Sequence, residues 1–404
     1  MAQPSGEPGP DDGALPPSAT AAVGVRGFGV YVHVPFCASR CGYCDFNTYT
    51  AAELGAGVSR DSYVDLVTGE LALAARVLAD TPPGRVDTIF VGGGTPTLLP
   101  PGELGRIVEL IDKTWGLAAG AEVTTEANPE SVDPVSLRRL REAGFTRISL
   151  GMQSAAPHVL AVLDRRHTPG RAIAAAAEAR AAGFEHVNLD LIYGTPGETA
   201  GDFAGSLAAA VAAGVDHVSA YSLIVEDGTR LAARIARGEL PYPDDDVAAD
   251  RYLAAEVALG AAGFSWYEVS NWARGQAARC RHNVLYWTGG DWWGFGPGAH
   301  SHVGGVRWWN VKHPTAYAAR LAAGRSPAQA REVLSAAESH TEDVMLGLRL
   351  AGGLPLSTVD SRDAAARALA GGLLEPGPYA AGRAVLTLRG RLLADAVVRD
   401  LLPG

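Results

Sequence analysis

The chain has 404 residues, of which 47% are hydrophobic, and a formal net charge of −10 at pH 7. This length allows two or three domains with a large core, and the acidic balance gives no electrostatic case for binding nucleic acid or an anionic membrane surface. No uninterrupted apolar run approaches the roughly 20 residues that a transmembrane helix needs, so we expect no integral membrane segment.

Residues 1–26 are rich in Gly, Pro, Ala and Ser, and they lack a basic segment followed by an apolar core. This composition predicts a disordered N-terminal segment rather than a signal peptide. Three of the four cysteines fall within eight positions and the fourth stands alone, so no disulfide framework is indicated. We therefore expect a reducing, cytoplasmic location.

The three clustered cysteines follow a predicted strand, Val30 to Val34, which ends before a proline. Cys37, Cys41 and Cys44 have C-x3-C-x2-C spacing, and three thiolates from one loop can hold a soft metal or an iron–sulfur cluster. A structural zinc site usually takes four ligands, commonly as two close pairs. We therefore expect a [4Fe–4S] cluster with one iron free for an exogenous ligand; a zinc knot and unrelated buried thiols are the alternatives.

Short apolar strands then alternate with helical periodicity through the next part of the chain. The predicted strands cover residues 86–91, 122–126, 147–150, 186–192 and 217–224, and the helices cover 59–79, 103–113, 134–143, 157–163, 171–182 and 203–213. Six strand–helix units in series favour an α/β fold with a parallel sheet and right-handed crossovers. Six units fall short of the eight that close a full barrel, so we expect an open, partial (β/α)6 barrel in residues 27–265.

Glycine-rich and polar motifs come directly after several predicted strands, where the carboxyl ends of a parallel sheet gather chemistry. The turn GGGTPT contains Gly93, Gly94 and Thr95, whose backbone can approach a ligand closely and bind a carboxylate through its amides. The other polar residues near strand ends are Glu126, Gln153, Arg165 and Asp190. Taken singly, each is explained more often as a loop residue or local cap. As a set around one mouth, they predict a site for a charged amino acid and a ribose.

Residues 266–330 are dense in aromatics and glycine and contain the motif HNxxYW. If this motif is helical, His282 faces Tyr286 and Asn283 faces Trp287 at i,i+4 spacing. A histidine beside large aromatics could ligate a heme iron while the rings pack on the macrocycle. The alternative is an aromatic packing seam with a hydrogen-bonded histidine. Weaker candidates for the heme contact are His300, His302 and Cys280.

Residues 331–404 predict a small α+β module, similar to a winged helix, made of helical pieces and a short strand near Ala384 to Leu388. The segment holds eight arginines and nine acidic residues, which gives no charge support for reading DNA.

From Tyr31 onward the chain resembles the oxygen-independent coproporphyrinogen oxidase-like branch of the radical S-adenosylmethionine (SAM) proteins. The motifs that carry the resemblance are YVHVPFCxxxCxYCDFN, GGGTPT, GMQS, DLIYGTPGE, YEVSN and HNxxYW. Coproporphyrinogen dehydrogenases carry a fourth cysteine where this chain has Phe46, and they lack HNxxYW. In both respects the chain is instead similar to the heme chaperone HemW family.

The resemblance implies that the open iron of the cluster takes the amino and carboxylate groups of SAM. The residues that it places around SAM are Tyr31, Gly93, Gly94, Thr95, Glu126, Gln153, Arg165 and Asp190. It makes His282 the first-choice heme contact, with Asn283, Tyr286 and Trp287 around it. A second SAM is not indicated, because the stretch YSLIVEDGT offers no matching motif.

The function implied by the resemblance is that of a heme chaperone, which binds heme and passes it to heme-accepting respiratory proteins, with peripheral membrane association. The alternative is a SAM-dependent enzyme of porphyrin biosynthesis that oxidatively decarboxylates the propionates of coproporphyrinogen III.

Overall fold

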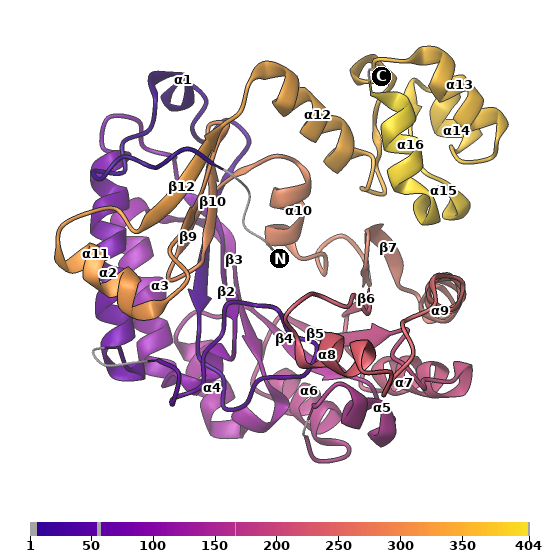
Figure 1. Ribbon diagram of the computed structural model, residues 1–404, viewed down its shortest axis with the longest axis horizontal. Coiled ribbons are helices and arrows are strands. Elements are labelled where there is room, and N and C mark those ends of the chain that lie inside the picture. The colour runs from indigo at the N-terminus through magenta and orange to yellow at the C-terminus, as the bar shows by residue number, and fades with distance from the viewer. Residues whose placement is uncertain (1–5, 55–57, 166, 403–404) are drawn as a thin grey trace.

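The computed structural model describes residues 6–54, 58–165 and 167–402, and a parallel sheet forms its centre (Figure 1). Six strands pair in chain order, each parallel to the next. They are β1 (Phe28–Val34), β2 (Val86–Gly93), β3 (Leu117–Ala127), β4 (Arg147–Gln153), β5 (His186–Tyr193) and β6 (His217–Ser222). This confirms the expected partial (β/α)6 barrel.

Helices cover the outer face of these strands, as the strand–helix alternation predicts (Figure 1). They are α2 (Arg60–Val77), α3 (Pro101–Trp115), α4 (Pro134–Glu142), α6 (Arg171–Ala181), α7 (Ala200–Ala212) and α9 (Asp245–Ala261). Two more helices, α5 (Pro157–Val162) and α8 (Arg230–Ala236), lie instead against the loop that carries the three clustered cysteines. Capping boxes fix where three of them begin, since Ser59, Asp133 and Thr199 each accept from the third backbone N–H of their helix.

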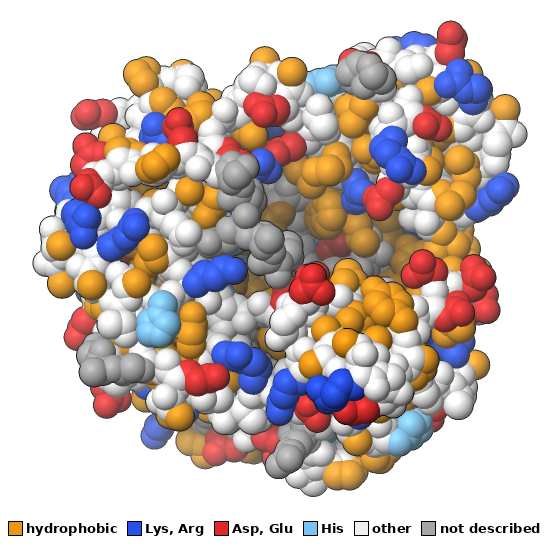
Figure 2. Space-filling model, viewed as in Figure 1, with side chains coloured by type: hydrophobic (Ala, Val, Ile, Leu, Met, Phe, Trp, Pro, Cys, Tyr) orange, Lys and Arg blue, Asp and Glu red, His pale blue; other side chains and the backbone are white. Residues whose placement is uncertain are grey.

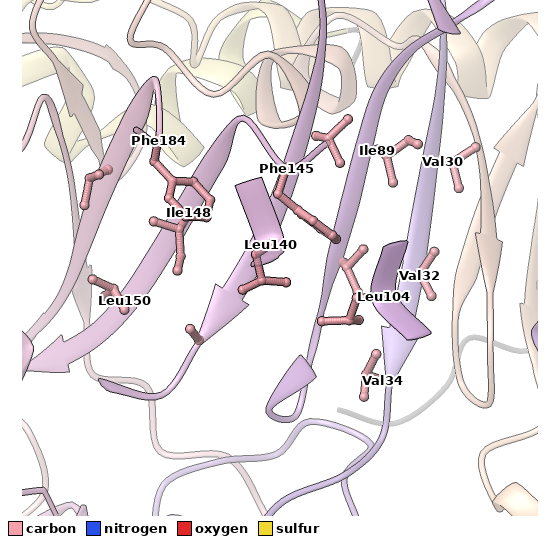
Figure 3. Close-up of a cluster of buried hydrophobic side chains, with 14 of the residues drawn as sticks. Val30, Val32, Val34, Ile89, Leu104, Leu140, Phe145, Ile148, Leu150 and Phe184 are labelled. Atoms are coloured by element: carbon pink, nitrogen blue, oxygen red, sulfur yellow. The ribbon is translucent and has the colours of Figure 1, made fainter. Parts of the chain in front are cut away.

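The core lies between the sheet and these helices. Val30, Val32 and Val34 point from one face of β1, beside Ile89 of β2 and against Leu104 of α3 (Figure 3). Each such side chain contributes about 1.5–3 kcal/mol when fully buried. Because side chains alternate along a strand, the residues between these valines face the interior of the barrel.

Residues 266–330 extend this sheet at both edges and form no separate unit. Next to β6 lies β8 (Asn271–Ala273), antiparallel to it, and β7 (Ser265–Glu268) pairs antiparallel with β8. Next to β1 lies β9 (Asp291–Phe295), which is parallel to it. The sheet then continues through β10 (His300–Val303), β11 (Val306–Asn310) and β12 (Ala328–Val333). The helix α11 (Pro314–Ala322) connects β11 to β12 and contacts α2.

The expected domain boundaries therefore need correction, because 265/266 falls inside β7 and 330/331 falls inside β12. The physical reason is that an open barrel leaves unpaired backbone groups at two edges, which the added strands satisfy.

The N-terminal segment also differs from its predicted disorder. Residues 1–5 lie outside the described residues, but Glu7 and Arg331 exchange two backbone hydrogen bonds of 2.9 and 2.8 Å. The segment then forms α1 (Pro17–Thr20), whose Ala19 is fully buried, and the Gly24 amide donates to the Asp291 carboxylate at 2.8 Å. Disorder is therefore the wrong prediction for residues 6–26, because the composition did not reveal that β12 offers a partner edge.

The C-terminal module is a small α+β unit with its own cluster of buried side chains. Its elements are α12 (Ala336–Gly347), β13 (Leu354–Pro355), the 3-10 turn η3 (Leu356–Thr358), α13 (Arg362–Ala370), α14 (Pro376–Ala380), β14 (Arg383–Ala384), α15 (Leu388–Leu392) and α16 (Ala394–Leu401). The strand expected at 384–388 is shorter than predicted, because α15 begins at Leu388.

Arg391 makes one of the contacts between the module and the barrel. Its guanidinium lies 3.9 Å from the centre of the Trp266 ring, and its Nη1 lies 3.0 Å from the Glu256 carboxylate. In the described part of the chain, every helix is too short or too polar to span a bilayer.

Candidate functional site

The cysteine loop leaves the carboxyl end of β1 and is held at both its base and its tip. The Cys37 amide donates to the Tyr49 carbonyl at 3.0 Å, and the Tyr49 amide donates to the Pro35 carbonyl at 2.7 Å. Further along, the Gly42 amide donates to the Leu163 carbonyl at 3.0 Å, which attaches the loop to the end of α5. The three thiols of this loop lie at the rim of the barrel. They are half-buried and form no disulfide with another described cysteine.

Arg165 brings a positive charge to these thiols. Its Nη1 donates to the Cys41 sulfur at 3.5 Å, and its Nη2 donates to the Gly151 carbonyl at 3.0 Å. Burial raises the pKa of Cys37, and it raises the pKa of Cys44 to about 12. The buried Nε of Arg165 has no hydrogen-bond partner among the described residues. A half-buried cation with a free donor beside three thiols fits thiolates and an anionic ligand group.

No three His, Cys, Asp or Glu side chains of the described residues converge on a single-ion site. An iron–sulfur cluster takes its thiolates on separate irons, so its ligands do not have to meet at one point.

The glycine-rich turn lies directly against the cysteine loop. The Gly94 amide donates to the Val34 carbonyl at 2.8 Å, and the Thr95 amide donates to the Phe36 carbonyl at 2.7 Å. A Cβ atom at Gly94 would lie only 2.4 Å from the Phe36 carbonyl oxygen, and Gly93 has a φ of +105°. These positions therefore require glycine, both for close approach and for backbone conformation. The 3-10 turn η1 (Pro96–Leu98) follows.

Two carboxylates complete the rim, Glu126 from β3 and Asp190 from β5. The Gly93 amide donates to Glu126 Oε2 at 2.9 Å, and burial together with the charge of Asp190 raises the pKa of Glu126 to about 7. Asp190 accepts from the Ser149 hydroxyl at 2.8 Å and from the Asn188 amide at 2.7 Å, and burial raises its pKa as well. Acceptors of this kind suit hydroxyl or ammonium groups.

Gln153 and Tyr31 come from β4 and β1. Gln153 ends β4 with a left-handed φ of +65°, an uncommon conformation for a residue other than glycine. Tyr31 faces the barrel interior, with its hydroxyl 3.0 Å from His33 Nδ1. The structure thus brings seven of the eight expected SAM-contacting residues to positions at or near strand ends and in the following loops, whereas Tyr31 lies in the middle of β1.

The HNxxYW motif forms a helix, α10 (Arg281–Trp287), as the i,i+4 spacing requires. His282 is only 1% exposed, with Nδ1 at 2.8 Å from the Thr88 hydroxyl and Nε2 at 2.7 Å from the Tyr286 hydroxyl. Its ring stacks on Phe90 at 5.3 Å, and burial lowers its pKa to about 3. Because both ring nitrogens are engaged, His282 has no free ligand atom in this structure. The packing alternative describes His282 in this structure, and the heme contact at His282 stays a prediction.

A buried ion pair that sequence reasoning missed holds α10 inside the barrel. Arg147 Nε donates to Glu122 Oε2 at 2.9 Å, and the His282 amide donates to the other oxygen of Glu122 at 3.1 Å. Arg147 Nη2 also donates to the Ala278 carbonyl at 2.8 Å, which fixes the segment before α10. The available signal was a pair of charged residues on two adjacent predicted strands.

The other three residues of the motif line a pocket of about 400 Å³ at the open side of the barrel. The lining residues are Tyr221, Glu268, Val269, Ser270, Asn271, Asn283, Tyr286, Trp287 and Leu346. Figure 2 shows the surface hollowed between the barrel and the C-terminal module, with hydrophobic side chains along the margin of the hollow. Sequence reasoning missed Tyr221, Val269 and Leu346, because they come from three elements that only the fold brings together.

The weaker candidates for the heme contact lie outside this pocket. His300 and His302 are on β10, and His302 Nδ1 lies 3.1 Å from the Gly290 carbonyl oxygen. Cys280 is buried, with its sulfur 3.6 Å from Glu122.

Comparisons with known proteins agree with this arrangement. The Radical SAM superfamily matches residues 31–210. The chain is 59% identical over 377 residues to a heme chaperone HemW of Mycobacterium tuberculosis (strain ATCC 25618 / H37Rv), covering 93% of this chain and 95% of that one. It is 33% identical over 325 residues to a heme chaperone HemW of Bacillus subtilis (strain 168), covering 80% and 84%.

A solved structure shares the fold across nearly the whole chain. Coproporphyrinogen III oxidase (HemN) from Escherichia coli, a radical SAM enzyme, aligns with a TM-score of 0.78 and 23% identity, covering 95% of this chain and 92% of that one. At this identity the likeness concerns the fold alone. The high identity over almost the full length of the named relatives is what decides the family: the chain belongs to the heme chaperone HemW family of radical SAM proteins.

Proposed function

We propose that this protein is a heme chaperone that binds heme and passes it to heme-accepting proteins, respiratory enzymes among them. The observation that carries the proposal is the 59% identity, over 93% of this chain, to proteins named as heme chaperones. The pocket lined by Asn283, Tyr286 and Trp287 supports it, because an apolar, aromatic cleft with a few polar groups suits a flat macrocycle.

The proposal includes a [4Fe–4S] cluster on Cys37, Cys41 and Cys44, and SAM held by the eight residues at the barrel rim. Within the part of the chain that the structure describes, the three thiols form no disulfide and the Nε of Arg165 has no hydrogen-bond partner, and both observations support this assignment. A reduced cluster supplies one electron to SAM when both are bound. The protein's own part is to hold them: Arg165 lies between the sulfur of Cys41 and the end of β4, and Glu126 fixes the glycine-rich turn.

The proposed setting is a reducing cytoplasm, since cysteines that hold a cluster have to remain thiolates.

The test is an anaerobic titration of the cluster-loaded protein with ferric heme, followed by addition of apomyoglobin as a generic acceptor. We expect a saturable one-to-one complex from which heme moves to the acceptor. Absence of specific binding would contradict the proposal.

A second assay addresses the enzyme alternative by supplying SAM, a reductant and coproporphyrinogen III. We expect no decarboxylated product, and its formation would put the enzyme of porphyrin biosynthesis first.

A further inference from the structure

A row of buried polar side chains lies beside Asp190 on the inner face of the barrel. Asn188 and Asp190 are two residues apart on β5, so their side chains point to the same side of the sheet. The strand register places Ser149 of β4 and His217 of β6 on either side of Asn188. It also pairs Ser219 of β6 with Asp190. Because these neighbours of Asp190 are buried, their polar atoms need hydrogen-bond partners inside the protein.

The chemistry of the groups fixes the direction of the hydrogen bonds around Asn188. Its Nδ2 lies 2.7 Å from Asp190 Oδ1, and an ionised carboxylate can only accept, so the amide nitrogen has to face Asp190. The amide oxygen of Asn188 then lies 2.7 Å from His217 Nδ1. That ring nitrogen therefore carries a proton and donates it, an assignment that follows from the hydrogen-bond network.

The same reasoning extends the hydrogen-bond chain to β7. Burial holds the pKa of His217 well below its ordinary value, so the ring is neutral at pH 7 and its Nε2 accepts. The Tyr267 hydroxyl, 2.7 Å away, donates to this Nε2, and its oxygen accepts from the Cys280 amide at 3.2 Å. Every donor thus points the same way, from the residue that precedes α10 to the carboxylate of Asp190.

This hydrogen-bond chain fixes the orientation of the Asp190 carboxylate. The Ser149 hydroxyl donates to Oδ2 at 2.8 Å while Asn188 donates to Oδ1, and each carboxylate oxygen keeps a lone pair for a further donor. A ligand group whose own partners are buried and hydrogen-bonded is preorganised for binding. Asp190 is therefore held ready to accept from a bound molecule.

The position of Asp190 indicates which part of SAM it would meet. Glu126 of β3 holds the glycine-rich turn beside the cysteine loop, where the amino acid end of SAM is expected. Asp190 lies on β5, which β4 separates from β3. The donors at the other end of SAM that match a carboxylate of this kind are the ribose hydroxyls.

We propose that Asn188, His217 and Tyr267 are positioning residues for SAM, whose hydrogen bonds hold Asp190 as the acceptor for the ribose hydroxyls. The inference rests on the proposed SAM site and deepens it, because these three residues act through Asp190. It also gives a role to the tyrosine of the YEVSN motif, which lies on β7.

The first measurement is the ¹⁵N spectrum of the histidine rings in the full-length, unmodified protein. We expect His217 to carry its proton on Nδ1 and to accept a hydrogen bond at Nε2. The His217→Gln variant assigns the signals. A proton on Nε2, or a doubly protonated ring at pH 7, would overturn the direction of the hydrogen-bond chain and the inference with it.

The second measurement is calorimetry on the cluster-loaded protein with two ligands, SAM and its analogue whose ribose lacks both hydroxyls. Asn188→Leu has a similar size but cannot donate to Asp190. It should raise the Kd for SAM about tenfold, or ~1.4 kcal/mol, and change the Kd for the analogue less than about twofold. Tyr267→Phe removes only the donor to His217 and should raise the Kd for SAM about threefold.

His186→Gln is the matched control. His186 lies on the same strand as Asn188, and its Nδ1 is 2.6 Å from Asp216 Oδ2, outside the hydrogen-bond chain. This variant should leave the Kd for both ligands unchanged.

Comparing the two ligands separates positioning from a merely structural role. Equal weakening of SAM and of the analogue in Asn188→Leu and Tyr267→Phe would overturn the inference, as would an unchanged Kd for SAM. If Asn188→Leu does not fold, Tyr267→Phe and the ¹⁵N spectrum decide the question. An unmodified protein that binds neither ligand would refute the proposed SAM site itself, which is a different result from equal weakening.

Discussion

Glu70 shows how a single buried side chain joins three parts of the molecule. It lies on α2, is 1% exposed, and accepts from the Gly296 amide at 2.8 Å, from the Asn310 amide at 2.7 Å and from the Tyr317 hydroxyl. Burial raises the pKa of Glu70 to about 7 in spite of these donors. Glu70 therefore links α2 to the strands of the aromatic segment, residues 266–330, and to α11. The free-energy cost of ionising this buried carboxyl group depends on pH.

The Glu70→Gln variant should be destabilised, because its amide nitrogen must replace an oxygen that faces either the Gly296 or the Asn310 N–H. We expect a loss of about 1–3 kcal/mol in the free energy of unfolding. The folded state holds the Glu70 proton at higher pH than the unfolded state does, so this residue contributes more stability at low pH. That contribution falls as pH rises from 4.5, the ordinary pKa of a glutamate, through about 7.

Urea unfolding of both proteins at pH 5 and pH 8 measures this effect. The stability advantage of the unmodified protein over Glu70→Gln should shrink at the higher pH. Because Glu126 and Glu198 also have a pKa raised to about 7, only the difference between the two proteins isolates Glu70. A difference that grows with pH would contradict the assignment.

Arg165→Lys should weaken SAM binding, because lysine cannot contact the Cys41 sulfur and the Gly151 carbonyl at once with one planar group. We expect the Kd for SAM to rise about tenfold, or ~1.4 kcal/mol. Calorimetry on cluster-loaded protein measures it, with Arg106→Lys, an exposed arginine beside Asp65, as the matched control. An unchanged Kd would remove Arg165 from the proposed SAM site.

At the scale of elements, α10 depends on contacts made inside the barrel more than on its own seven residues. A helix this short is marginal alone, and here the Glu122–Arg147 ion pair fixes both its first amide and the preceding segment. The position of the HNxxYW side chains therefore follows from two strands that lie far from the motif in sequence.

Replacing Arg147 with Met should be strongly destabilising, because it leaves the Glu122 carboxylate buried without its partner. We expect a loss of about 3–5 kcal/mol, with faster hydrogen exchange in α10. Thermal unfolding and exchange measurements check it, with Arg141→Met as a more exposed control. The double variant Glu122→Gln, Arg147→Met should recover much of the loss; a single variant that behaves like the control would refute the role of the pair.

At the scale of the whole molecule, the C-terminal module and the barrel share the pocket. Leu346 of α12 lines it together with residues of α10 and β8, and Arg391 docks the module onto Trp266 and Glu256. Module docking and ligand binding are therefore expected to be coupled.

Arg391→Ala should loosen the module, with a loss of roughly 1–2 kcal/mol from the cation–π contact and its ion pair. Limited proteolysis should cut the variant sooner in the segment between β12 and α13, and heme binding should weaken. Arg389→Ala is the matched control, since that side chain donates to the Gly371 carbonyl within the module. Equal protease sensitivity of the two variants would argue against docking through Arg391.

The sequence alone was enough to predict the partial barrel and the cysteine loop. Each of these depends on local spacing, namely strand–helix alternation and C-x3-C-x2-C. Convergence of Glu126, Gln153, Arg165 and Asp190 was also predictable, because parallel strands end at a common edge. The cluster, SAM and heme contacts of these residues remain predictions.

Only the tertiary structure decided what pairs with the edges of the sheet and what surrounds His282. Residues 6–26 and the aromatic segment are ordered by strands distant in sequence, and His282 is engaged by Thr88 from β2. The composition of a segment does not reveal which strand it will pair with. Unpaired backbone N–H and C=O groups at an open sheet edge can hydrogen-bond to any segment that the fold places beside them. The pocket was likewise not predictable from the sequence. Its lining residues Tyr221, Val269 and Leu346 come from β6, from the turn between β7 and β8, and from α12, which only the tertiary structure brings together.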